Sequence, residues 1–253
     1  MYSILFYASC FLLIAVDALC IVLGLLISGK HKSCSGQLGL IFIIKGVLSL
    51  ISDSYPLITS LSPSFASKTA VMFKLSVLFL TIASLVLIVM LLKTRYGSVH
   101  PGLYVVVIML TVSGYVASIF VKICMEMYMK HMDAWYYRFA VSLGFDGDRY
   151  YIFVSLVTSI VSAVFSIIMW IIVTRAFYVR RDMEKMFPSM WVFVMSHIWI
   201  ILANLFISNI TLIKPGFPDL LCIILQLVID LVMPGFALRF LMDLNRKKSE
   251  TVW

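Results

Sequence analysis

Seven long apolar stretches occupy most of the 253 residues, and each is about as long as a bilayer is thick. A helix needs about 20 apolar residues to cross the hydrocarbon core. The stretches cover residues 3–28, 38–61, 70–92, 103–125, 150–174, 189–213 and 218–242. Because uninterrupted apolar runs carry this signal, and not short alternating segments, the sequence predicts an all-α bundle of seven transmembrane helices.

The composition excludes a soluble protein of this size. Hydrophobic residues make up 62% of the chain and charged residues 13%, and the mean hydropathy is +1.06. The breaks 29–37, 62–69 and 214–217 leave no room for an extramembrane domain, and the longest break, 126–149, is expected to be a loop. The sequence therefore predicts a single seven-helix domain over residues 1–253. Most of its surface is expected to face lipid and not water.

The basic residues predict the orientation of the chain. Twelve Lys and Arg residues fall on the side of the C-terminus, and seven fall on the opposite side, where acidic residues dilute them. Positive residues stay on the cytoplasmic side of short loops. We therefore expect an N-terminus outside, a cytoplasmic C-terminus and a multi-pass location, in the plasma membrane. The net charge of +8 reflects this anchoring pattern, and no nucleic-acid partner is expected.

Three ionisable residues inside the apolar stretches lie at a similar depth. These are Asp17, Lys45 and Asp230. A charge inside a span costs a few kcal/mol on insertion scales unless it is paired or faces a wet interior. The expected arrangement is an intramembrane polar cluster in which Lys45 bridges Asp17 and Asp230. Such a cluster can hold the helices together, switch between two conformations, or form an ion or proton pathway.

Polar residues in the presumed outer half suggest a ligand pocket. Asp53 is followed by Tyr55 and Pro56, and a proline at this place is expected to kink the helix and open space beside the carboxylate. Asp53 can equally be an interfacial residue near the helix end. Tyr115 and Gln226 complete the pocket hypothesis, because they combine polarity with a suitable depth.

No pattern in the sequence indicates an enzyme, a metal site or a cofactor. The four histidines are His31, His100, His131 and His197, and their positions along the spans do not converge on one metal ion. The last span, 218–242, has no lysine for a retinal Schiff base. No nucleophile elbow, phosphate loop or paired-carboxylate motif is present.

Two short motifs carry a family resemblance. Thr94-Arg95-Tyr96 at the end of the third span resembles the D-R-Y motif of rhodopsin-like G-protein-coupled receptors, with Thr94 in the acidic position. The segment from Asp230 to Phe236 is similar to the N-P-x-x-Y region, of which Pro234 matches. With seven spans and an N-terminus outside, the chain most resembles the divergent nematode serpentine chemoreceptors.

The resemblance implies a chemosensory receptor. Such a receptor binds a small external ligand in the outer half of the bundle and couples to a heterotrimeric G protein at the inner face. The residues implied in coupling are Arg95 as the principal contact, with Tyr96, Arg180, Arg181 and Lys185 beside it. The alternative for the last three is topogenic charge that attracts anionic membrane lipid.

Two other classes of membrane protein remain open. Sugar-type transporters of this size also have seven helices, built from two parallel three-helix repeats. Pro56 lies in the second span, whereas the sixth span, which corresponds to it in such a repeat, has no interior proline. A structural or assembly membrane protein is the third class, and it predicts no dependence on a ligand.

Overall fold

The computed structural model describes residues 2–30, 35–97, 99–127, 134–180, 190–213 and 219–250. The elements in these ranges are helical, and none is a strand. The helices are α1 (Tyr2–Ser28), α2 (Ser35–Leu61), α3 (Pro63–Tyr96), α4 (Gly102–Met127), α5 (Trp135–Ser142), the 3-10 turn η2 (Gly147–Arg149), α6 (Tyr150–Tyr178), α7 (Met190–Ile213), α8 (Asp219–Asp230) and α9 (Val232–Glu250).

The all-α seven-helix bundle expected from the sequence is confirmed. Seven helical segments are long and apolar enough to cross a membrane, the seventh being formed by α8 and α9 together. Many large apolar side chains point away from the bundle, among them Phe11, Phe79, Phe120 and Trp199. Water does not tolerate such a surface around a whole molecule, whereas lipid does. The chain is a multi-pass integral membrane protein.

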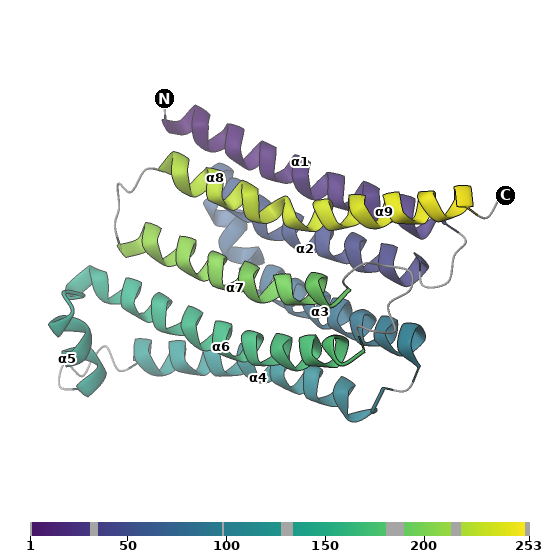
Figure 1. Cartoon of the computed structure of the whole chain (residues 1–253). Coiled ribbons are helices and arrows are strands. Elements are labelled where there is room, and N and C mark those ends of the chain that lie inside the picture. The colour runs from purple at the N-terminus through teal and green to yellow at the C-terminus, as the bar shows by residue number, and fades with distance from the viewer. Residues whose placement is uncertain are drawn as a thin grey trace.

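The helices form a closed ring in chain order. α1 packs on α2, α2 on α3, α3 on α4, α4 on α6, α6 on α7 and α7 on α8, and α9 returns to α1 (Figure 1). The contact between α1 and α2 is the most extensive of these. Each helix thus lies beside its neighbours in sequence, which is the arrangement that short connections favour.

Glycines explain why α1 and α2 pack so closely. A Cβ atom placed on Gly39 of α2 would lie 2.5 Å from the carbonyl oxygen of Gly24 and 2.5 Å from the backbone nitrogen of Ser28, both in α1. A Cβ on Gly46 would lie 2.6 Å from Ile21. Small residues let helix backbones approach in a membrane, where dispersion contacts replace the hydrophobic effect as the force that joins helices.

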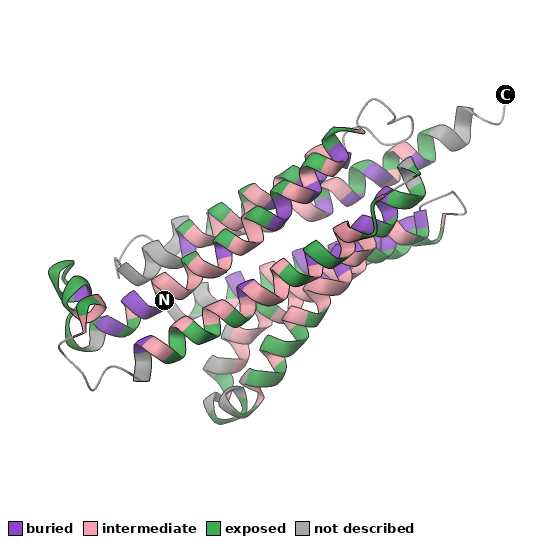
Figure 2. Cartoon of the chain, turned by 90° about the horizontal axis from the view of Figure 1, so that it is seen from below, coloured by how far each residue is buried: buried purple, intermediate pink, exposed green. Residues whose placement is uncertain are grey.

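The buried core lies at one end of the bundle. The main cluster of buried residues comes from the end of α1, the starts of α2, α4 and α7, the ends of α3 and α6, and the middle of α9. Its centre is a group of phenylalanines, with Phe42 and Phe193 in edge-to-face contact at 5.5 Å and Phe42 and Phe240 at 5.8 Å. Figure 2 shows this densely buried part toward the end where the chain terminates. The opposite half, nearer α5, is packed less tightly.

The segment 126–149, expected to be a loop, contains a helix, and that expectation was wrong. α5 rests on the start of α6, with Tyr137 and Tyr150 rings 5.2 Å apart and Phe139 and Phe153 rings 6.1 Å apart. The hydroxyl of Tyr150 donates to the carbonyl of Met125 in α4 at 3.3 Å. Aromatic burial therefore orders a segment that is too short and too polar to span the membrane.

Two helix boundaries also differ from those expected. The break 62–69 does not exist as such, because α3 begins at Pro63, and proline is well tolerated in the first turn of a helix. The seventh span is interrupted at Leu231, between α8 and α9. Pro234 has no N–H to donate to the carbonyl of Asp230, so one helical hydrogen bond is missing there, whereas the N–H groups of Leu231 and Gly235 bond to the carbonyls of Leu227 and Leu231, both at 3.0 Å.

Candidate functional site

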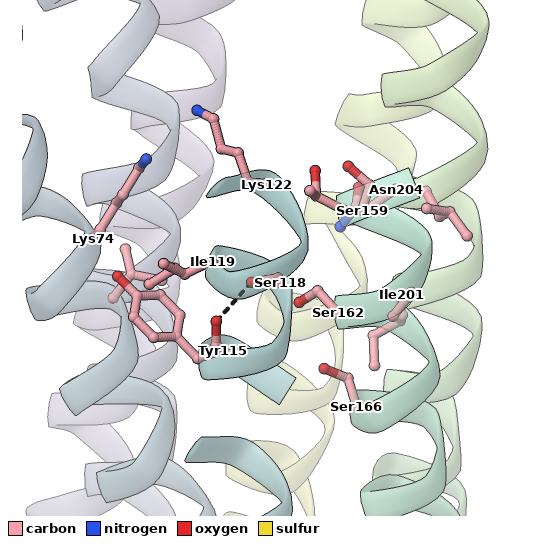
Figure 3. A pocket seen from close by; sticks show the side chains of 14 residues that line it. Lys74, Tyr115, Ser118, Ile119, Lys122, Ser159, Ser162, Ser166, Ile201 and Asn204 are labelled. Atoms are coloured by element: carbon pink, nitrogen blue, oxygen red, sulfur yellow. Dashed lines mark hydrogen bonds between the residues drawn. The ribbon is translucent and has the colours of Figure 1, made fainter. Parts of the chain in front are cut away.

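A cavity of about 590 Å³ lies among α3, α4, α6 and α7, in the half of the bundle nearer α5 (Figure 3). Nine of its fourteen lining residues carry a polar side-chain group, and apolar residues make up the rest. The polar residues that line it are Lys74, Tyr115, Ser118, Lys122, Thr158, Ser159, Ser162, Ser166 and Asn204. A volume of this size suits a small organic ligand, for which pockets of about 300–1,000 Å³ are usual.

Helical spacing brings the hydroxyl groups to the cavity. Ser159, Ser162 and Ser166 follow one another at intervals of three and four residues, so they share one face of α6. Tyr115 and Ser118 do the same on α4, where the Ser118 hydroxyl donates to the carbonyl of Tyr115 at 2.8 Å. Each hydroxyl can satisfy itself on its own helix and still accept or donate to a ligand.

Two smaller cavities adjoin the first. One has a volume of about 260 Å³ and is lined by Ile51, Ser52, Tyr55, Phe73, Lys74, Val77 and Tyr115. The other measures about 160 Å³ and shares Tyr115, Ser162 and Ser166 with the main cavity. The Tyr55 and Phe73 rings meet edge to face at 5.0 Å and form an aromatic wall in the first of these. Tyr115 belongs to all three cavities and stands where they meet.

The four residues of the pocket hypothesis separate into two pairs. Tyr115 and Tyr55 line the cavities, as just described. Asp53 and Gln226 line none of these three cavities; Asp53 lies close to Asp17, and Gln226 donates through Nε2 to both carboxylate oxygens of Asp230, at 3.2 and 3.1 Å. α2 continues as a helix through Pro56 to Leu61.

The carboxyl groups of Asp17, Asp53 and Asp230 lie near one another, and Lys45 is not among them. Asp17 and Asp53 lie within hydrogen-bonding reach of each other, and Asp230 is close enough to interact electrostatically with both. The expected bridge from Lys45 to Asp17 and Asp230 was wrong, because no ion pair joins them in the described part of the chain. The similar depth expected for Asp17, Lys45 and Asp230 does not bring Lys45 to the carboxyl groups, because its side chain is directed toward Trp170.

Lys45 lies over an aromatic ring. Its Nζ is 5.3 Å from the ring centroid of Trp170 in α6. The other partner of this ring is His197 of α7, stacked with a centroid separation of 4.0 Å and an interplanar angle of 20°. His197 is anchored through Nδ1 and the carbonyl of Phe193 at 3.0 Å. A cation held against the face of an indole is stabilised by the ring quadrupole, which partly replaces a counter-ion.

Three of the residues implied in G-protein coupling, Arg95, Tyr96 and Arg180, come at helix ends on the densely packed side of the bundle. Arg95 and Tyr96 form the last turn of α3, which ends where Gly97 adopts a φ of 86° and its N–H bonds to the carbonyl of Lys93. Nothing is described of the Arg95 and Tyr96 side chains. Arg180 follows α6 and donates through Nη1 to the carbonyl of Ala176 at 3.0 Å. Arg181 and Lys185 lie outside the described residues.

Metal binding has no cluster to support it in the described ranges. No group of three or more His, Cys, Asp and Glu side chains there is arranged to hold a metal ion. Asp17 of α1, Asp53 of α2 and Asp230 of α8 are near enough to influence one another electrostatically. Two carboxyl groups as close as Asp17 and Asp53 repel each other unless a proton lies between them.

The cavity should admit water, and cysteine labelling tests this. In a background with Cys34, Cys124 and Cys222 changed to serine, Ser162→Cys is expected to react with a membrane-impermeant thiol reagent added on the side of α5. Val164→Cys is the matched control, because Val164 is exposed on the opposite face of the same helix, toward lipid, where no thiolate forms. Equal labelling of the two cysteines would mean that the cavity is not a separate aqueous space.

No known protein family, curated protein or solved structure matches the chain. The structure itself shows a seven-helix integral membrane protein that is densely packed at one end and holds a hydroxyl-lined cavity toward the other.

Proposed function

We propose that the chain is a chemosensory receptor that binds a small external ligand in the cavity lined by Tyr115 and the α6 serines. The observation that carries this proposal is the asymmetry of the bundle. The cavity lies among α3, α4, α6 and α7 near α5, whereas the buried aromatic core lies at the other end. A ligand site in one half and a tightly packed two-state contact in the other are the two parts that a transmembrane signal needs.

The proposed signal is a shift between two arrangements of the helices. A ligand that fills the cavity contacts α6 and α7 together with α3 and α4, so it favours the arrangement of these helices that fits it best. A tenfold difference in affinity between two arrangements is worth about 1.4 kcal/mol. The Phe42–Phe193–Phe240 contacts join α2, α7 and α9 at the far end, so a movement of α7 must repack them.

Coupling to a heterotrimeric G protein is proposed at that far end. There α3 ends in Arg95 and Tyr96, and Arg180 follows the end of α6. With the N-terminus outside, this end would lie on the cytoplasmic side of the plasma membrane. A rearrangement of the buried core to which α3, α6 and α7 contribute would bring Arg95 into contact with the partner, with Tyr96, Arg181 and Lys185 close in sequence to the same helix ends. The remaining basic residues at this end would contact anionic lipid.

The test of the proposal is G-protein recruitment in cells that display the chain. A panel of small organic molecules is applied, and recruitment to the membrane is measured for the wild type and for Arg95→Ala. We expect a ligand-dependent signal that Arg95→Ala lowers at least tenfold, because a charge-assisted contact to a partner is worth about 1.5–3 kcal/mol. Cell-surface amounts of both proteins are measured in parallel, and Arg239→Ala serves as a control charge removal.

Two outcomes would point to the other classes of membrane protein. Uptake of a labelled solute without any recruitment would identify a transporter. The ring in which each helix packs on its neighbours, with a glycine-lined contact between α1 and α2, gives no sign of two equal three-helix halves. Neither uptake nor recruitment, at a normal surface amount, would favour a structural or assembly role.

A further inference from the structure

We propose that the ligand of the cavity is a small carboxylic acid with an apolar tail. Its carboxylate would lie between Lys74 and Lys122, and its tail would enter the adjoining chamber walled by Tyr55 and Phe73. The inference rests on the proposed function only in taking the cavity as a ligand site. It goes further by assigning the charge and the shape of what binds there.

The charge of the lining points to an anion. Of the fourteen residues that line the main cavity, two are lysines and none is acidic. Lys74 comes from α3 and Lys122 from α4, and Figure 3 shows both side chains directed toward the same end of the cavity. A cavity with cations and low-dielectric walls concentrates anions and repels cations.

The depth of the lysines fixes where the charge of the ligand would lie. The apolar spans run from Val71 to Thr94 in α3 and from Gly102 to Met125 in α4, so Lys74 and Lys122 are each within about one turn of the end nearer α5. The anionic group would therefore remain near the mouth. The rest of the molecule would point inward, toward the hydroxyls of Ser162 and Ser166 or toward the smaller chamber.

The smaller chamber indicates an apolar tail. It has a volume of about 260 Å³ and shares Lys74, Val77 and Tyr115 with the main cavity. The remainder of its lining is mostly apolar or aromatic, with Ile51 beside the Tyr55–Phe73 pair. A chain attached to a carboxylate at Lys74 reaches this chamber directly. Burial of such a chain contributes about 0.8 kcal/mol for each CH₂ group.

A carboxylate fits this site better than a phosphate. It has two acceptor oxygens and a single charge to remove from water, whereas a phosphate monoester carries close to two charges at neutral pH. The cost of removing an ion from water rises steeply with its charge. The inward half of the cavity offers hydroxyls and an amide but no third cation to offset a second charge.

The experiment compares matched molecules that differ in one group. The thermal stability of the purified chain in neutral detergent is measured with octanoate, octanol, octylamine and acetate at pH 7. We expect a saturable stabilisation by octanoate, at least tenfold weaker apparent affinity for octanol and for acetate, and none for octylamine. Equal stabilisation by octanol or octylamine would overturn the assignment of an anion, and equal stabilisation by acetate would overturn the tail.

Variants locate the site and separate it from general binding to the bundle. Lys74→Gln is expected to weaken octanoate binding about tenfold, because one charge-assisted contact is lost. Lys68→Gln removes a charge from the same helix outside the cavity and should leave the affinity unchanged. Phe73→Trp, which fills the smaller chamber, should abolish the advantage of octanoate over acetate. Equal effects of Lys74→Gln and Lys68→Gln would refute the site.

Two further comparisons test whether a lipid headgroup occupies the site and whether ligand binding is coupled to signalling. Reconstitution in nanodiscs with and without an anionic phospholipid shows whether a lipid headgroup takes this place, and loss of octanoate binding only in the anionic discs would mean that it does. If octanoate binds but no G protein is recruited, the receptor function fails and the site stands. If a cationic or neutral ligand drives recruitment, the function stands and the carboxylate inference fails.

Discussion

Gly39→Leu is expected to lower the stability of the folded bundle by about 3 kcal/mol or more, because the new side chain meets backbone atoms that cannot rotate away. Even a Cβ on Gly39 would lie 2.5 Å from the carbonyl oxygen of Gly24 and from the backbone nitrogen of Ser28. The two helices must therefore separate along their most extensive contact. The measurement is thermal or denaturant-induced unfolding of the purified protein in mixed micelles.

The matched control is Gly36→Leu, one turn earlier on the same helix. Gly36 is exposed, and a Cβ atom placed there meets nothing within 4 Å. This variant should stay within about 0.5 kcal/mol of the wild type, as surface changes usually do. If both variants unfold alike, the loss comes from helix propensity or lipid contact, and the close approach of α1 and α2 is not what holds them.

The sequence predicted the number and nature of the helices well because burial in lipid demands long apolar runs. Their ends were less predictable. Hydropathy finds the apolar part of a helix, but α3 begins before it, at Pro63, in a segment that mixes Ser, Thr and Lys with apolar residues. α5 was missed because it is stabilised by the rings of Tyr150 and Phe153, which lie in a different helix.

The candidate site was harder to predict, because the sequence gives the depth of a residue along its helix but not the direction in which its side chain points around the helix axis. Asp17, Lys45 and Asp230 have similar depths, but each residue turns about 100° around its helix axis, so their directions depend on how the helices are rotated in the bundle. Tyr115 and Tyr55, which were chosen for depth and polarity, line the cavities, and their role in binding a ligand stays a prediction. Ser159, Ser162 and Ser166 of α6 were missed, although their spacing of three and four residues indicates one polar helix face.

Trp170→Ala should be the second strongly destabilising change, with a loss of about 3–5 kcal/mol, as for other fully buried aromatic residues. Trp170 is 4% exposed and links three helices, since it stacks on His197 of α7 and lies under the Lys45 ammonium of α2. Unfolding of the purified protein measures the loss. Trp199→Ala is the control: that indole is 65% exposed, toward lipid, and its removal leaves no internal cavity.

Lys45→Met separates the cation from the packing at the same place. Methionine keeps the length and the apolar contacts, so this change alone should be neutral or stabilising, because an amino group that has no carboxylate partner among the described residues no longer has to be desolvated. In the absence of the Trp170 ring the lysine costs more, so adding Lys45→Met to Trp170→Ala should restore about 1–2 kcal/mol, the value of a desolvated cation–π contact. Strictly additive losses would mean that Lys45 gains nothing from the indole and that the ring acts through volume alone.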